Sequence, residues 1–291
     1  MTTSSPGRLG SRARTIGRGA VRQALTELRI QFFSWNLLSW LLFPALGLGV
    51  LFFLRDAQVM DSTVSLAELG FPGILTLSLV SSGFMGVAGQ LITEREDGTL
   101  LRAKAVPDGM TSHLIANMFI AIGTTLLPTL ALVLAATVVF DGLAPRGLQG
   151  WLVFGAVCVL GLAAFLPFGA VLGALVSGPM TLAWTSLFVY LVLSISGVFY
   201  PLSALPGWLQ VVGQALPPYW MGLGLRSAFL PLEAAALELG GSWHTGTVFV
   251  VLAGWAVIGV LLAPAALRRM ARRQSGSQVA AARERVISRG Y

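Results

Sequence analysis

The chain has 291 residues, of which 55% are hydrophobic and only 11% are charged. A soluble domain carries about 25% charged residues, so this chain cannot cover a water-facing surface, and a soluble globular enzyme is excluded. The 16 Phe and 8 Trp, with abundant Leu, Val and Ala, need burial, which excludes a disordered chain. Lipid is therefore the solvent for most of this protein.

Residues that bind metals, form disulfides or hold nucleotides are too few to build such sites. Cys158 is the single cysteine, and His113 and His244 lie far apart, so no zinc, haem or iron–sulfur spacing is present. The one lysine, Lys104, stands in Leu101-Arg-Ala-Lys-Ala-Val106, outside any Gly-Lys-Ser/Thr phosphate-binding loop. We expect no metal site, no cofactor and no catalytic residues in this chain.

Stretches without charged residues predict where the chain crosses the membrane. A spanning helix needs about 20 apolar residues, and four of the five long uncharged stretches hold one helix each. The remaining stretch, 147–225, holds more than one helix, because Val176-Ser-Gly-Pro179 predicts a tight turn inside it. The fold class is an all-α integral membrane protein with six transmembrane helices, near 35–54, 70–92, 114–140, 151–175, 180–199 and 247–267.

The basic residues are divided very unevenly between the two sides of such a protein. Six spans place both termini, the 93–113 loop and the 176–179 turn on one side. Three basic residues remain on the other side (Arg55, Arg146 and Arg226), with the acids Asp56, Asp61, Glu68, Asp141, Glu233 and Glu238. Positive charge gathers on the cytoplasmic side of membrane proteins, so we predict a multi-pass protein of the cell (plasma) membrane with both termini cytoplasmic. The arginines flank spans where anionic headgroups attract them, so they indicate membrane lipids as partners and no nucleic acid.

Residues 16–32 predict an amphipathic helix lying in the cytoplasmic interface. At about 100° per residue, seven apolar side chains share one half of the helix, with three arginines beside them: Ile16, Ala20, Val21, Ala24, Leu25, Leu28 and Phe32, with Arg18, Arg22 and Arg29. The alternative is a basic flank without fixed structure. The predicted domains are the basic N-terminus 1–34, the transmembrane domain 35–267 and the basic tail 268–291.

The densest charge in the chain follows the second span, in Thr93-Glu-Arg-Glu-Asp-Gly-Thr-Leu-Leu-Arg-Ala-Lys-Ala-Val-Pro107. Charges of both signs beside Leu100, Leu101 and Val106 favour a short helix whose polar face meets another protein. A solvated loop is the alternative.

A broken apolar segment follows the fifth span, at 199–220. Pro201, Pro206, Pro217 and Pro218 interrupt it, and proline disrupts the interior of a helix. The stretch between Pro206 and Pro217 is too short to cross, so we predict a re-entrant helical hairpin on the outer leaflet. Its aromatic residues are typical interfacial anchors: Tyr200, Trp208, Tyr219 and Trp220. A seventh span would place the arginine-rich tail outside, against the charge distribution.

No Asp, Glu, Lys, Arg or His lies inside a predicted span. Ion-coupled carriers usually place ionisable groups at the midplane, which counts against an ion-coupled secondary carrier. No repeated pore-lining motif favours a channel, and no catalytic set favours a membrane-embedded hydrolase or acyltransferase.

These features resemble the ABC type-2 exporter permeases, including those of the daunorubicin-resistance type. Glu94-Arg95-Glu96-Asp97-Gly98-Thr99-Leu100 followed by Pro107 is similar to the coupling motif of that family. Ser196-Gly-Val-Phe-Tyr-Pro201 and Leu205-Pro-Gly-Trp-Leu209 are similar to its extracellular re-entrant helices. The resemblance covers residues from about 16 to 267, and departs from the family in the basic run before Pro107.

The resemblance implies a transport permease that is no enzyme by itself. ATP and Mg would be bound by a separate ABC ATP-binding subunit, and a second permease subunit would complete a homodimer or heterodimer. The exported compound would be a lipophilic drug or antibiotic, with a lipid-linked glycan or lipid as the alternative. Coupling to the ATPase would use Glu94, Arg95, Glu96, Asp97, Gly98, Thr99, Leu100 and Pro107. The re-entrant extracellular segment would use Gly197, Tyr200, Pro201, Leu205, Pro206, Trp208 and Leu209.

The predicted topology is tested by reporter fusions. Fusions at Tyr291 and within 93–113 should read cytoplasmic, and fusions within 56–68 should read external, because the basic residues are divided sixteen to three. An external reading at Tyr291 would contradict the six-span topology.

Overall fold

The computed structural model describes residue 26 and residues 36–58, 64–99, 109–140, 143–176 and 178–273. Within these ranges the chain is built from helices, and the extended pairing that occurs there is an isolated bridge between Gln58 and Ser65. The prediction of an all-α protein is confirmed for this part of the chain. The predicted amphipathic helix 16–32, apart from the helical Thr26, and the tail beyond Arg273 lie outside the described residues.

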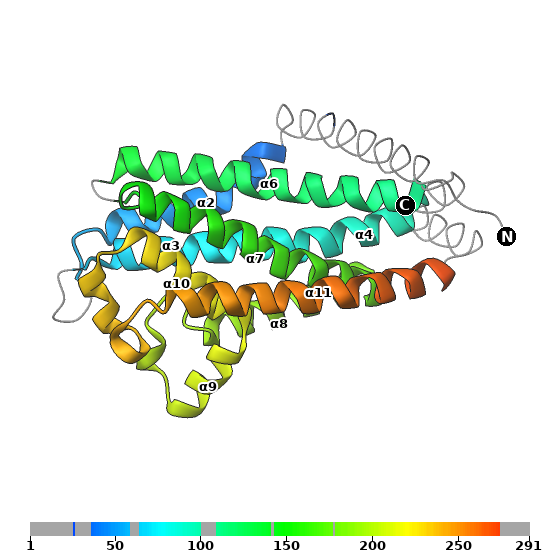
Figure 1. The fold of residues 1–291 in the computed structure, drawn as a ribbon. Helices are drawn as coiled ribbons and strands as arrows, with labels where there is room; N and C mark the ends of the chain where they lie inside the picture. The colour runs from blue at the N-terminus through cyan, green and yellow to red at the C-terminus, as the bar shows by residue number, and fades with distance from the viewer. Residues whose placement is uncertain are drawn as a thin grey trace, which may run out of the picture.

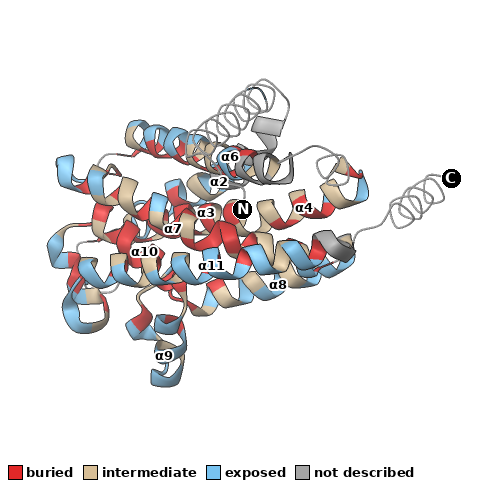
Figure 2. Ribbon diagram, turned by 45° about the vertical axis from the view of Figure 1, so that its right-hand side comes forward, coloured by how far each residue is buried: buried red, intermediate tan, exposed pale blue. Residues whose placement is uncertain are grey.

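The helices form an elongated bundle (Figure 1). In chain order they are α2 (Asn36–Phe53), α3 (Leu66–Val80), the π-helix η1 (Ser81–Gly86), α4 (Val87–Glu96), α6 (Gly109–Val139), α7 (Gly147–Leu175), α8 (Pro179–Ile195), η2 (Leu202–Ala204), α9 (Gly207–Ala215), α10 (Pro217–Phe229), η3 (Leu232–Leu237), η4 (Leu239–Gly241) and α11 (Thr245–Arg273). Figures 1 and 2 place α4 and α10 toward opposite ends of the bundle, with α9 projecting from its side.

Four helical stretches among the described residues are long and apolar enough to cross a membrane: Leu66–Glu96, Ala116–Val139, Gly147–Leu175 and Thr245–Met270. They coincide with the predicted second, third, fourth and sixth spans. Helices α2 and α8 occupy the positions of the first and fifth, with 18 and 17 residues. That length is close to the lower limit of about 17 residues for a spanning helix, so six spans remain a prediction.

The second span begins earlier than its apolar pattern indicates because a capping box fixes its start. The backbone N–H of Glu68 donates to Ser65 Oγ at 3.1 Å, and the N–H of Ser65 donates to Glu68 Oε2 at 2.9 Å. These two bonds satisfy donors that a helix N-terminus leaves free. The helix therefore starts at Leu66, four residues before the predicted 70–92.

Helix α7 is the centre of the bundle, and α11, α10, α4 and η1 all pack against it. Figure 2 shows buried residues concentrated on α7 and α10, with exposed residues along α8 and α11. The exposed side of α8 carries large apolar side chains: Met180, Trp184, Leu187, Phe188 and Leu191. An apolar face of this extent needs lipid or another subunit to cover it.

Two glycines allow α7 to approach the second span very closely. A Cβ added at Gly169 would lie 2.5 Å from the carbonyl oxygen of Phe84, and one at Gly173 would lie 2.9 Å from that of Ala88. Small residues spaced by four let helix backbones meet in a membrane. The contact begins at η1, where the π-helical turn locally widens the second span.

This packing predicts opposite effects for two alanine substitutions on one helix. Gly169→Ala should lower the free energy of unfolding by about 1–3 kcal/mol, since the added methyl group has no space. Gly155→Ala is the control, because nothing lies within 4 Å of the added atom, and alanine in a helix is favoured by about 0.5–1 kcal/mol. Melting curves in detergent measure both. Equal melting temperatures would contradict the close contact.

Candidate functional sites at the two ends of the bundle

The first candidate site lies where α4 ends and α6 begins. Glu94, on the last turn of α4, accepts hydrogen bonds from Asn117 Nδ2 at 2.8 Å and from Gln90 Nε2 at 3.1 Å. Its second carboxylate oxygen lies 3.0 Å from His113 Nε2. The side chains of Glu94 and His113 are only 12% and 11% exposed. Glu94 therefore points into the bundle and ties α4 to α6.

The next residue ties α4 to a different helix. Arg95 Nη1 donates to the carbonyl oxygens of Val176 at 3.0 Å and Gly173 at 3.3 Å. The last carbonyls of a helix lack partners within that helix, so a cation is favourable there. Arg95 thus caps the C-terminal end of α7.

The exposed charges at the end of α4 follow Arg95 directly in the chain. Glu96 and Asp97 are both exposed, and the N–H of Asp97 donates to the carbonyl of Thr93 at 2.9 Å. Gly98 has a φ of +73°, a backbone conformation that glycine adopts without strain. Thr99 is the last described residue before the gap, and Leu100 and Pro107 lie outside the described residues. Glu96 and Asp97 are therefore the acids that this turn exposes.

A cavity of about 450 Å³ lies beside the Glu94 contacts, between α4, α6, α7 and α11. Its walls are mostly apolar, with three polar side chains among the residues that line it: Val87, Gln90, Leu91, Asn117, Met118, Leu166, Pro167, Ala170, Val260, Ala263, Pro264, Leu267, Arg268 and Met270. Gln90 and Asn117 are also the two amide donors to Glu94. The sequence could not indicate this cavity, because it depends on the register of four helices.

The second candidate site is the broken segment between α8 and α11, at the opposite end. Pro201 and Pro206 stand immediately before η2 and α9, and Gln210 Nε2 donates to the carbonyl of Leu205 at 2.7 Å. Trp208 is exposed and Leu209 is half-buried on α9, an arrangement suited to an interfacial helix.

The turn before this segment is tight. Gly197 has a φ of +59°, and the hydroxyl of Tyr200 donates to the carbonyl of Ser194. A Cβ at Gly197 would lie 3.0 Å from Leu202. The predicted residues of this segment are therefore brought together around η2 and α9.

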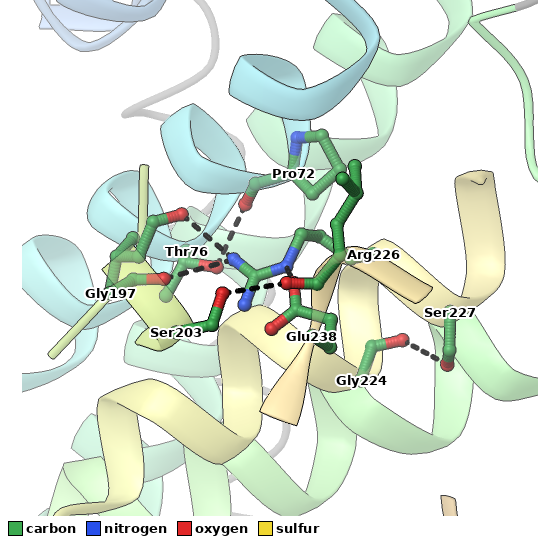
Figure 3. A network of polar contacts seen from close by, with 10 residues as sticks. Pro72, Thr76, Gly197, Ser203, Gly224, Arg226, Ser227 and Glu238 are labelled. Atoms are coloured by element: carbon green, nitrogen blue, oxygen red, sulfur yellow. Dashed lines mark hydrogen bonds and ion pairs between the residues drawn. The ribbon is translucent and has the colours of Figure 1, made fainter. Parts of the chain in front are cut away.

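Helix α10 extends beyond the predicted hairpin and is buried in the bundle. Eleven of its 13 residues are buried, including Arg226. Arg226 Nε lies 2.7 Å from Glu238 Oε1, with side chains 0% and 1% exposed. The contact is an ion pair without the alignment of a hydrogen bond. Arg226 Nη1 donates to the carbonyls of Gly197 and Val198, each at 3.1 Å (Figure 3).

Through the ion pair and these two hydrogen bonds, Arg226 joins three segments that are separate in the chain: α10, the turn after α8, and the residues between η3 and η4. Nearby, Ser203 Oγ donates to the carbonyl of Leu237 at 2.8 Å. The pKa of the Tyr219 hydroxyl is raised to about 12, mainly by burial and also by the Glu238 carboxylate, while Arg226 lowers it. Arg226 and Glu238, which the charge distribution assigns to the external side, are therefore buried and paired. Their side of the membrane stays a prediction.

The described residues contain no cluster of His, Cys, Asp or Glu that could hold a metal ion. The two ends contain hydrogen bonds and ion pairs that link helices, a turn with exposed acids and an apolar cavity. These features suit the transmission of movement and the binding of an amphiphile.

The comparisons with known proteins agree with this description. The family described as ABC-2 family transporter protein matches residues 44–263. The chain is also similar to a daunorubicin resistance ABC transporter permease protein, DrrB1, from Streptomyces coeruleorubidus. The two are 26% identical over 261 residues, which cover 87% of each chain.

The buried ion pair predicts that single and double substitutions differ. Arg226→Met leaves Glu238 buried without a cation, which should lower the free energy of unfolding by about 3–5 kcal/mol. Arg226→Met with Glu238→Met leaves no uncompensated charge, so it should recover part of that loss.

Unfolding of the purified protein in detergent measures these differences. Arg55→Met is the control, because the Arg55–Asp56 pair is 52% and 91% exposed and such pairs contribute about 0–1 kcal/mol. A double variant less stable than either single variant would contradict the uncompensated-charge explanation.

Proposed function

The chain belongs to the ABC-2 family of transporter proteins, and on that premise we propose that it is the membrane-spanning permease subunit of an ATP-driven exporter. ATP and Mg would be bound and hydrolysed on a separate ABC ATP-binding subunit. The absence of a Gly-Lys-Ser/Thr loop from this sequence supports that division of labour. The cell membrane would be crossed six times, with both termini cytoplasmic.

The proposed cargo is a lipophilic drug or antibiotic. The relative named for daunorubicin resistance supports this, since the similarity extends over most of both chains. Export of a lipid-linked glycan or lipid is the alternative within the same mechanism. An ion-coupled carrier is disfavoured, because the family match points to ATP-driven transport.

A second permease subunit would complete the transporter. The exposed apolar face of α8 supports this, because a contiguous face of that kind is covered by lipid or by protein. Either a second copy or a related chain could provide the partner.

The coupling proposal rests on one observation: two adjacent side chains of α4 contact two different helices. Glu94 holds α6 and Arg95 holds the end of α7. A force applied by the ATPase to the turn at Asp97 would therefore reach three helices together. In this proposal Glu96 and Asp97 contact the ATPase, while Glu94 and Arg95 transmit the movement within the permease.

The coupling proposal is tested by separating the exposed acids from the inward-facing one. Glu96→Ala with Asp97→Ala should leave abundance in the membrane intact and weaken ATPase docking by roughly 30-fold or more, as expected for truncating charged contacts at an interface. Glu94→Gln should retain the ATPase, because its side chain faces α6, but should lower ATP-dependent uptake of daunorubicin into inside-out vesicles.

Asp56→Ala with Glu233→Ala is the matched control, since both carboxylates are exposed and predicted to be external. Copurification of the ATPase and vesicle uptake are the two measurements. If the Glu96 and Asp97 variant still bound the ATPase and exported at the original rate, this turn would not be the coupling element.

A further inference from the structure

We propose that the cavity between α4, α6, α7 and α11 binds one acyl chain of an anionic phospholipid from the cytoplasmic leaflet. The cavity is formed by helices of this chain alone. The proposal goes beyond export, because it concerns a lipid that stays with the permease and does not depend on which compound is transported.

The walls of the cavity suit an acyl chain. Leu166 and Pro167 of α7, Ala263 and Pro264 of α11, and Val87 of α4 all line it. A volume of about 450 Å³ falls within the range of roughly 300–1,000 Å³ found for ligand pockets in proteins. A group that fills this space therefore has to be apolar over most of its length.

The cavity is accessible from the lipid-facing surface. Met118 and Val260 both line it, and their exposed fractions are 47% and 54%. Leu91 and Met270 are buried and pack together with Val87, Ala170, Ala174 and Leu267, which closes the wall between α4 and α11. An acyl chain can therefore enter sideways from the bilayer.

The polar groups at the cavity select an anionic head. Arg268 lines the cavity near the end of α11, is exposed, and forms no ion pair with any side chain in the ranges that the structure describes. Gln90 and Asn117 are half-buried at the same cavity. An arginine at the cytoplasmic interface attracts the phosphate of an anionic lipid and repels a lipophilic cation.

Such a lipid would also lie against the side chains that hold Glu94. Gln90 and Asn117 line the cavity and donate to the two-helix contact at Glu94. An acyl chain in place would fill the space between α11 and those donors, so occupancy and the α4–α6 contact would stabilise each other.

The test uses the purified full-length chain in phosphatidylcholine nanodiscs that contain a minor share of a lipid with a diazirine on one acyl chain. The probe is phosphatidylglycerol in one sample and phosphatidylcholine in the other. After photolysis, mass spectrometry should find the phosphatidylglycerol probe attached to peptides carrying Met118 or Val260, in clear excess over the phosphatidylcholine probe.

Two arginine variants provide the matched comparison, because Arg268 lines the cavity and its exposed neighbour Arg269 does not. Arg268→Gln should reduce the preference for phosphatidylglycerol by about fivefold, the effect of one basic residue at an anionic surface. Arg269→Gln should leave it nearly unchanged. Ala170→Phe, which fills the cavity, should reduce labelling by both probes, with folding checked by its melting curve.

Three outcomes would overturn the proposal. Equal labelling by the two probes would remove the headgroup preference, and equal effects of the two arginine variants would reduce it to a general surface attraction. Displacement of the probe by the lipophilic cation tetraphenylphosphonium, with Arg268→Gln without effect, would assign the cavity to cationic compounds. Export assays are not needed for any of these measurements, so a wrong assignment of the exported compound would not affect them.

Discussion

A charged side chain inside an apolar bundle has to be paired, and this constraint determines how both ends of the molecule are held together. Removing an ion from water costs several kcal/mol unless another charge or several hydrogen bonds compensate it. Arg226 meets Glu238 and two carbonyls, Arg95 meets two carbonyls of α7, and Glu94 meets an imidazole and two amides. Each compensation joins segments that are distant in the chain.

The two ends pair their buried charges with different kinds of partner. At the α4 end the partners come from α6 and α7, so each contact links two long helices. At the α10 end the partners come from short segments and turns, which have little regular structure of their own. The Arg226–Glu238 pair and the bonds of Arg226 to two carbonyls link those segments to each other.

Much of the fold could be predicted from the sequence because lipid imposes a simple length requirement. Uncharged stretches of sufficient length coincide with four long helices, and prolines mark the breaks before η2 and α9. The start of the second span was missed because the capping box of Ser65 and Glu68 acts through hydrogen bonds, not hydropathy.

The candidate sites were harder to predict than the helices. Glu94 and Glu96 are equivalent in a sequence pattern, yet one turns toward α6 and the other toward the outside, because that depends on how α4 is rotated in the bundle. Arg226 and Glu238 are 12 residues apart and lie in different elements, so the sequence does not predict that they pair. The family resemblance indicated the turn after the second span, which is a property of local sequence.

The π-helical segment η1 has a consequence for how this chain can change in evolution. A π-turn holds one residue more than an α-turn, so it accommodates an extra residue while the helix on either side keeps its facing. A one-residue deletion between Ser81 and Gly86 can therefore restore regular α-helix and leave Glu94 against α6 and Arg95 against α7. A deletion in the first turn of α4 would act differently, because each residue of an α-helix rotates the chain by about 100° and both side chains would turn away from their partners. Within the second span, η1 is thus the place where a change of length disturbs these contacts least.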